Sequence, residues 1–154
     1  MRQVVEWFKG APNDVPERGI VMAKMPREVI TALGDEHSLK VLATADDTGL
    51  PNAAIVATIT PLGEEMVAFA DLRMGKTRDN LDSTKKFAVT VLTPQMKSYQ
   101  IKGTFEGFQE TGPLAASVNE MVYNAIKMQI KAVGLGSVDE VYSACMDTPG
   151  AKLA

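Results

Sequence analysis

The segment LKVLATADDTGLPNAAIV, residues 39–56, contains two short apolar runs on either side of DDTGLP. Short runs rich in Val, Ile, Thr and Ala are typical of β-strands. Asp, Gly and Pro are turn-forming residues, so the sequence between the runs predicts a tight connection. The segment therefore predicts two consecutive strands joined by a turn.

Strand-like runs recur along the chain and predict a small barrel. Residues 98–108, SYQIKGTFEGF, place Tyr99, Ile101, Gly103 and Phe105 on one face, as in a half-buried antiparallel strand. We expect the first three strands to form an antiparallel meander. Many short strands with few helices favour a mainly β fold, a six-stranded antiparallel barrel with flanking helices. The six predicted strands cover residues 39–45, 52–60, 66–70, 87–93, 98–108 and 136–144.

Apolar spacing and helix-end residues predict three helices. Pro26 suits a first helical position and Gly34 suits the residue that ends the same helix. Residues 75–86 are predicted to form a short polar helix, and residues 111–130 a longer amphipathic one.

Length and charge limit the class of protein. The chain has 154 residues, enough for one domain with a substantial core. It carries 16 Lys and Arg against 19 Asp and Glu, a net charge of -3, which argues against a general nucleic-acid binder. Residues 1–24 are predicted to be an N-terminal arm and residues 25–154 the domain. Apolar residues in 4–8 pack either on the domain itself or against a partner subunit or ligand, and the sequence leaves both open.

The single cysteine, Cys145, rules out an internal disulfide and favours a reducing compartment. The chain shows neither the apolar core of a signal peptide nor a run of about 18 apolar residues that would span a membrane. We therefore expect a cytoplasmic protein.

The segment RMGKTRDN, residues 73–80, has three cations at a predicted helix start. The amino-terminal end of a helix carries partial positive charge and free N–H groups, so cations there are unfavourable unless an anion neutralises them. A phosphate would meet the N–H groups, the Lys76 ammonium and the Thr77 hydroxyl, and Gly75 would permit close approach. The alternative is a solvated basic turn, and the residues alone favour neither.

Few other side chains suggest chemistry. His37 is the only histidine and has no cysteine nearby, so the sequence predicts no metal site and no Ser-His-Asp set. Cys145 is interpreted as a structural thiol. Because no acid, base or nucleophile is identified, any reaction is expected to depend on a cofactor.

The order of predicted elements, from Pro26 to the tail, resembles the FMN-binding split-barrel family, which includes pyridoxamine 5'-phosphate oxidase and its small flavoprotein relatives. The resemblance rests on LKVLATADDTGLPNAAIV, VAFADLRMGKTRDNL and VDEVYSACMDTPGAK. It implies a split barrel in which two strands face the flavin ring and Lys76 and Thr77 hold the phosphate. The cofactor-binding residues that it implies are Ile55, Val56, Ala57, Ala70, Asp71, Leu72, Arg73, Lys76, Thr77 and Asn80.

The resemblance also implies a function. The expected protein is a homodimer that binds FMN at the subunit interface and acts as a flavin-dependent oxidoreductase or electron carrier, with an unknown redox partner or small-molecule substrate. One alternative is a deazaflavin-dependent reductase of the same fold. A second is a haem- or ligand-binding sensor without flavin chemistry.

Overall fold

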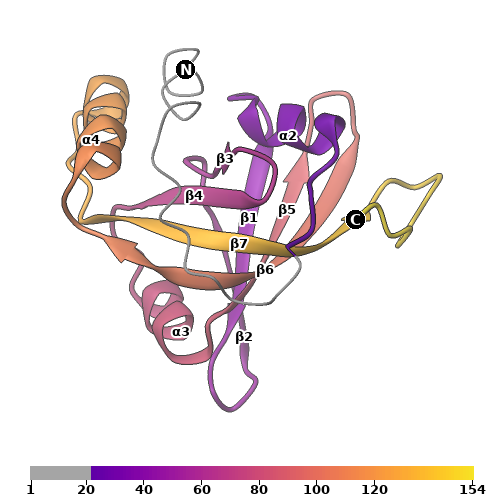
Figure 1. The fold of residues 1–154 in the computed structure, drawn as a ribbon, viewed down its shortest axis with the longest axis horizontal. Coiled ribbons are helices and arrows are strands. Elements are labelled where there is room, and N and C mark those ends of the chain that lie inside the picture. Colours follow the sequence, from indigo (N-terminus) through magenta and orange to yellow (C-terminus); the bar gives the residue numbers. More distant parts are fainter. Residues whose placement is uncertain (1–21) are drawn as a thin grey trace.

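Seven strands form one continuous sheet in the computed structural model, which describes residues 22–154. The predicted apolar cluster of the arm lies outside the described residues. Every strand pair is antiparallel, in the order β2-β1-β5-β6-β7-β4-β3, and the sheet curls upon itself (Figure 1). The strands are β1 (Leu39–Ala45), β2 (Pro51–Ile55), β3 (Thr60–Leu62), β4 (Met66–Asp71), β5 (Lys86–Leu92), β6 (Ser98–Gln109) and β7 (Ala132–Ser143).

The predicted strand over residues 52–60 ends as β2 at Ile55, and its last residue, Thr60, begins a separate strand, β3, so the expected count of six was one too low. β2 pairs with β1 and β3 pairs with β4, at opposite edges of the sheet. The intervening residues turn inward: Ile59 is 1% exposed, and its N–H donates to the carbonyl of Val56. The expected three-stranded meander therefore does not form, because the chain crosses from one edge to the other between β2 and β3.

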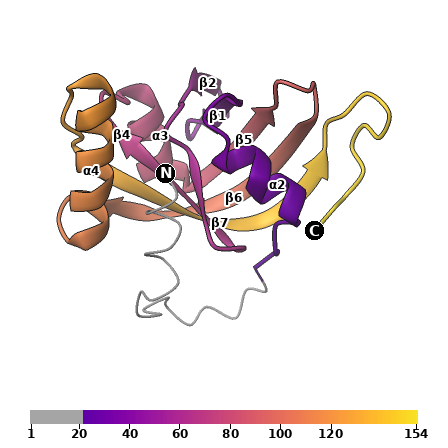
Figure 2. The same ribbon diagram turned by 90° about the horizontal axis from the view of Figure 1, so that it is seen from above.

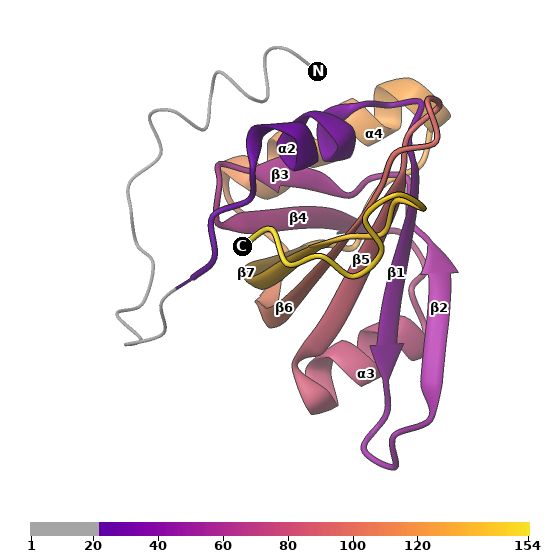
Figure 3. The same ribbon diagram turned by 90° about the vertical axis from the view of Figure 1, so that its right-hand side faces the viewer.

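The three predicted helices are present as α2 (Arg27–Gly34), α3 (Lys76–Thr84) and α4 (Pro113–Ile126). α3 and α4 end earlier than predicted because Lys85 and Lys127, each at φ 57°, turn the chain into the left-handed conformation. α2 and α3 lie at opposite ends of the curled sheet (Figure 3), and α4 lies beside the ends of β4 and β7 (Figure 2). None of the helices in residues 22–154 is long and apolar enough to cross a membrane.

The core fills the inside of the curled sheet and confirms the predicted alternation in β6. Tyr99, Ile101, Gly103 and Phe105 are buried, whereas Lys102 and Glu106, on the opposite face of the strand, are exposed. Phe87 projects from β5 over Gly103 of β6 and Gly136 of β7. A side chain at either glycine would overlap its ring. The ring thus takes the space that two side chains would otherwise fill.

Lys40 is the one lysine of the described residues that lies within this core. It is 2% exposed and shares the inner face of β1 with Leu42 and Thr44. Burial lowers the pKa of its ammonium, and the negative charge of Asp35 partly opposes that shift.

Candidate functional site

The turn from β4 into α3 presents the basic segment at the surface of the sheet. Gly75 precedes the helix at φ 45° and ψ -118°, a conformation that glycine adopts without the strain of a side chain. No side chain caps this end of the helix, and the N–H of Thr77 bonds to the carbonyl of Met74 at 3.0 Å. Lys76 is consequently exposed at the helix start, and Thr77, one residue later, is buried.

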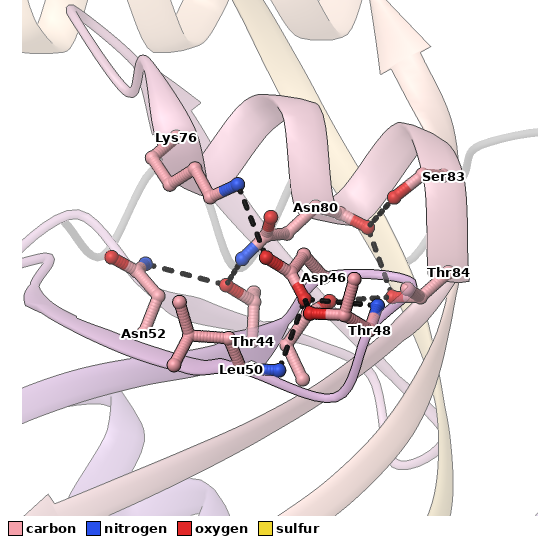
Figure 4. Close-up of polar contacts among 10 residues, drawn as sticks. Thr44, Asp46, Thr48, Leu50, Asn52, Lys76, Asn80, Ser83 and Thr84 are labelled. Carbon is pink, nitrogen blue, oxygen red and sulfur yellow. Dashed lines mark hydrogen bonds and ion pairs between the residues drawn. The ribbon is translucent and has the colours of Figure 1, made fainter.

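Four polar side chains from three elements meet beneath the first turn of α3, and we call them the polar quartet: Thr44, Asn52, Thr77 and Asn80. The Asn52 amide donates to the hydroxyls of Thr77 at 3.0 Å and Thr44 at 3.3 Å. The Asn80 amide donates to the same Thr44 hydroxyl at 3.1 Å (Figure 4). Buried amides and hydroxyls need such partners, so these bonds fix α3 against β1 and β2.

Lys76, next to the polar quartet, forms an ion pair with a carboxylate. Its Nζ lies 3.4 Å from Oδ2 of Asp46, in the turn between β1 and β2 (Figure 4). The other carboxylate oxygen, Oδ1, accepts bonds from the Thr48 hydroxyl at 2.6 Å and from the N–H groups of Thr48 and Leu50 at 3.0 Å each. The Thr48 hydroxyl bond is the largest of the effects that lower the pKa of Asp46 to about 2, so its carboxylate is charged at neutral pH.

The positive charge of Arg78 is paired with acidic side chains of the protein itself. Its guanidinium forms an ion pair with Asp71 and lies over the Phe108 ring, 4.2 Å from the ring centroid. The hydrogen bond to Asp71 is the main reason that the pKa of Arg78 is raised. Glu110 adds a second ion pair at 3.5 Å. Arg78 therefore joins α3 to β4 and β6.

Two hydrogen bonds hold together the segments that carry the predicted cofactor-binding residues. The Asn52–Thr77 bond holds the start of β2 to α3, and a bond of 3.0 Å from the Ala70 N–H to the Thr58 hydroxyl holds the segment after β2 to β4. Residues 55–57 are thereby kept near residues 70–72. Their exposure differs: Ile55 is 70% exposed, whereas Ala70 is 2% and Asp71 1% exposed.

Two of these predicted residues have side-chain environments that the sequence did not anticipate. The Asp71 carboxylate is occupied by Arg78 and by the N–H of Met74, at 3.0 Å. Arg73 is exposed and has no ion pair with the described residues.

Sequence reasoning missed Thr44, Asp46 and Asn52. Thr44 could have been found because it follows Lys40 and Leu42 at two-residue spacing and so points inward. Asp46 and Asn52 flank the turn, and nothing in their spacing indicates that they face α3. His37 lies at the surface, and no cluster of His, Cys, Asp or Glu within residues 22–154 could hold a metal ion.

Several known proteins are similar to this chain in sequence or in structure. No protein-family model matches the sequence. The chain is 31% identical over 139 residues to the uncharacterized protein MJ0282 of Methanocaldococcus jannaschii, which covers 88% of this chain and 91% of that protein. Among solved structures, HupZ of Group A Streptococcus superposes with a TM-score of 0.72 at 20% identity, covering 84% of this chain and 99% of HupZ.

Two further structures bear family descriptions. An FMN-binding protein from Syntrophomonas wolfei has a TM-score of 0.67 at 16% identity, covering 78% of this chain and 88% of that one. A candidate pyridoxamine 5'-phosphate oxidase from Lactobacillus delbrueckii has a TM-score of 0.63 at 20% identity, covering 77% and 93%. The chain therefore has the split-barrel fold of the pyridoxamine 5'-phosphate oxidase-like proteins.

Other proteins with this fold have names that mention different ligands. Because their sequence identity to this chain is low, they show a shared fold and nothing more. An F420 reductase has a TM-score of 0.54 at 19% identity, covering 82% of this chain and 98% of that one. HutZ, a haem storage protein from Vibrio cholerae, has a TM-score of 0.55 at 13% identity, covering 79% and 95%. The predicted mainly β split-barrel fold is thus confirmed.

Proposed function

We propose that this protein binds FMN and acts as a flavin-dependent oxidoreductase or electron carrier. The observation that carries the proposal is the start of α3, where an exposed lysine, Lys76, and an uncapped helix end adjoin Thr77, the buried threonine of the polar quartet. An ammonium, a hydroxyl and N–H groups form a donor set suited to a phosphate. The cofactor supplies the redox chemistry, because flavin transfers a hydride or single electrons without a protein nucleophile.

Each part of the chain has a separate task in this proposal. Lys76 and Thr77 hold the phosphate. Asn80, buried one turn later, keeps the first turn of α3 in place through its bond to Thr44. Residues 55–57 and 70–73 line the side where the ring and its chain would lie, and Asp71 contributes by fixing the β4–α3 turn.

The phosphate assignment predicts a difference between FMN and riboflavin, since riboflavin lacks the phosphate. Replacing Lys76 with alanine is expected to weaken FMN binding by about 1.5–3 kcal/mol, roughly ten- to hundredfold, and to leave riboflavin binding nearly unchanged. Fluorescence titration of both flavins measures the two affinities. Lys24→Ala is the matched control, because Lys24 is also exposed and pairs with one carboxylate, that of Glu64, at 3.7 Å.

The visible spectrum of the purified protein separates the proposal from its alternatives. A flavin spectrum supports FMN. A deazaflavin or haem spectrum would favour a reductase related to the F420 enzyme or a haem protein related to HutZ. Equal losses of FMN and riboflavin affinity in Lys76→Ala would show that the mutation disturbs the fold and that Lys76 is no phosphate contact.

We also propose that the protein is a homodimer, because apolar side chains gather on one uncovered side of the sheet. Leu39, Leu50 and Ile55 of the β1–β2 hairpin and its turn are 46%, 63% and 70% exposed. A groove of about 740 Å³ is lined by residues of β1, β5, β6 and β7, in which small side chains such as Ala43 and Ala88 lie among charged residues, Lys86, Lys102, Asp139 and Glu140. The exposed apolar side chains of the hairpin favour a symmetric contact with a second copy.

Light scattering tests the dimer. The wild-type protein is expected at about 33 kDa, twice the 16.6 kDa of the chain. Ile55→Glu places a charge in the proposed contact and should yield the monomer mass. Met146→Glu, at a position that is 98% exposed in the tail, should leave the mass unchanged. A wild-type monomer that still holds flavin would contradict the proposal.

The cytoplasmic location expected from the sequence stays a prediction.

A further inference from the structure

We propose that Asp46 is an internal counter-charge to Lys76 that weakens every phosphate contact at the candidate site, so that a phosphate is retained only when its ligand is also held elsewhere. This inference rests on the proposed function, since it takes Lys76 as the phosphate contact. Its basis is the pairing of Lys76 with Asp46 and the way in which the β1–β2 turn holds that carboxylate.

The position of Asp46 is set by its own turn and does not depend on Lys76. Oδ1 accepts three bonds from Thr48 and Leu50, and the Asp46 N–H donates to the carbonyl of Leu50 at 3.1 Å. These contacts leave Oδ2 facing the lysine. The Asp46 side chain is 14% exposed, whereas that of Lys76 is 57% exposed, so the lysine is the partner that is free to move.

Lys76 and Asp46 together carry no net charge, and few other cations are available nearby. Arg78 is neutralised by Asp71, with Glu110 and Asp82 as further acidic neighbours at 3.5 and 3.9 Å. Of the three cations in residues 73–80, only Arg73 is exposed and has no ion pair with the described residues. The segment that looks strongly basic in the sequence is therefore close to neutral in space.

A phosphate at Lys76 would lie close to the Asp46 carboxylate. An oxygen bonded to Nζ at about 3 Å is at most about 6.5 Å from Oδ2, since Nζ is itself 3.4 Å from Oδ2. That separation is shorter than the ~8 Å over which salt screens charges, so the two anions repel each other. Free phosphate has only the helix start to hold it against this repulsion, whereas FMN is also held through its ring.

Removing the charge of Asp46 should therefore strengthen phosphate binding. Asp46→Asn keeps an Oδ1 acceptor for the turn, because asparagine forms the same local bonds. The matched control is Asp47→Asn, which removes the neighbouring charge of the same turn from an exposed side chain that contacts no cation of the described residues.

Two titrations test the inference on the full chain. Inorganic phosphate, followed through the NMR shifts of the Lys76 and Thr77 amides, is expected to bind about three- to tenfold more tightly to Asp46→Asn than to wild type. Asp47→Asn should remain within about twofold of wild type. FMN should gain affinity in Asp46→Asn by a similar factor, and riboflavin should not change. In the double variant Asp46→Asn/Lys76→Ala the gain should disappear, because without the lysine the phosphate is no longer held beside position 46.

The outcomes separate this inference from the proposed function. If no flavin binds but phosphate tightens only in Asp46→Asn, Asp46 has the inferred role and the flavin proposal fails. If flavin binds and Asp46→Asn leaves FMN and phosphate affinities unchanged or weaker, the inference is overturned and the flavin proposal stands. An equal gain in Asp47→Asn, or a gain that persists without Lys76, also overturns it. The Thr48 and Leu50 amide shifts report whether the turn is intact, and Asp46→Ser, which retains a turn-forming oxygen, replaces Asp46→Asn if it is not.

Discussion

Alanine at position 103 is expected to destabilise the protein by about 3 kcal/mol or more, the upper range for overpacked cores. A Cβ on Gly103 would overlap the carbonyl oxygen of Ser137 in β7 and the ring of Phe87 in β5. The side chain of Phe87 could shift only by leaving its place over Gly136, and the carbonyl belongs to the strand backbone. Both neighbours are therefore fixed, and β6 would have to separate from β7.

Urea unfolding followed by circular dichroism measures this loss. The control is Gly34→Ala at the end of α2, where nothing lies within 4 Å of an added Cβ. That variant should be as stable as wild type or up to about 1 kcal/mol more stable, because alanine reduces the freedom of the unfolded chain. If Gly103→Ala unfolds at the same urea concentration as wild type, the packing of Phe87 against β6 is not as described.

The sequence predicted most of the fold because its strands are strongly patterned. The alternation in residues 98–108 and the turn residues of DDTGLP are local signals, and β6 and the β1–β2 hairpin follow them. The crossing between β2 and β3 has no local signal. Residues 52–60 all suit a strand, yet β2 ends at Ile55 and β3 begins only at Thr60, where the chain pairs with β4 at the far edge of the sheet.

The candidate site was predictable only in part, because some of its contacts also join segments that are far apart in the sequence. Lys76 and Thr77 are adjacent in sequence, and a basic helix start signals that they belong together. Asp46 lies 30 residues before Lys76, and its contact depends on how the β1–β2 turn folds over α3. The sequence therefore shows which cations are present, and the structure shows how many of them are neutralised.

Arg78 illustrates this limit most clearly, and its partner Asp71 provides the second large effect. Replacing Asp71 with alanine is expected to cost about 2–4 kcal/mol of stability. Breaking a buried ion pair costs roughly 3–5 kcal/mol, and the value here is lower because the Arg78 side chain is 29% exposed and can regain water. The Met74 N–H also loses its acceptor, so the β4–α3 turn loosens.

Asp82→Ala is the matched control for Asp71→Ala. Asp82 also faces Arg78, at 3.9 Å, but its side chain is 53% exposed, and an exposed pair contributes less than about 1 kcal/mol. Thermal or urea unfolding of both variants should therefore give a large loss for Asp71→Ala and a small one for Asp82→Ala. Flavin titration then separates two roles for Asp71. If it fixes the turn, FMN and riboflavin affinities fall together with stability; if it contacts the cofactor directly, flavin affinity falls while the unfolding midpoint stays at the wild-type value.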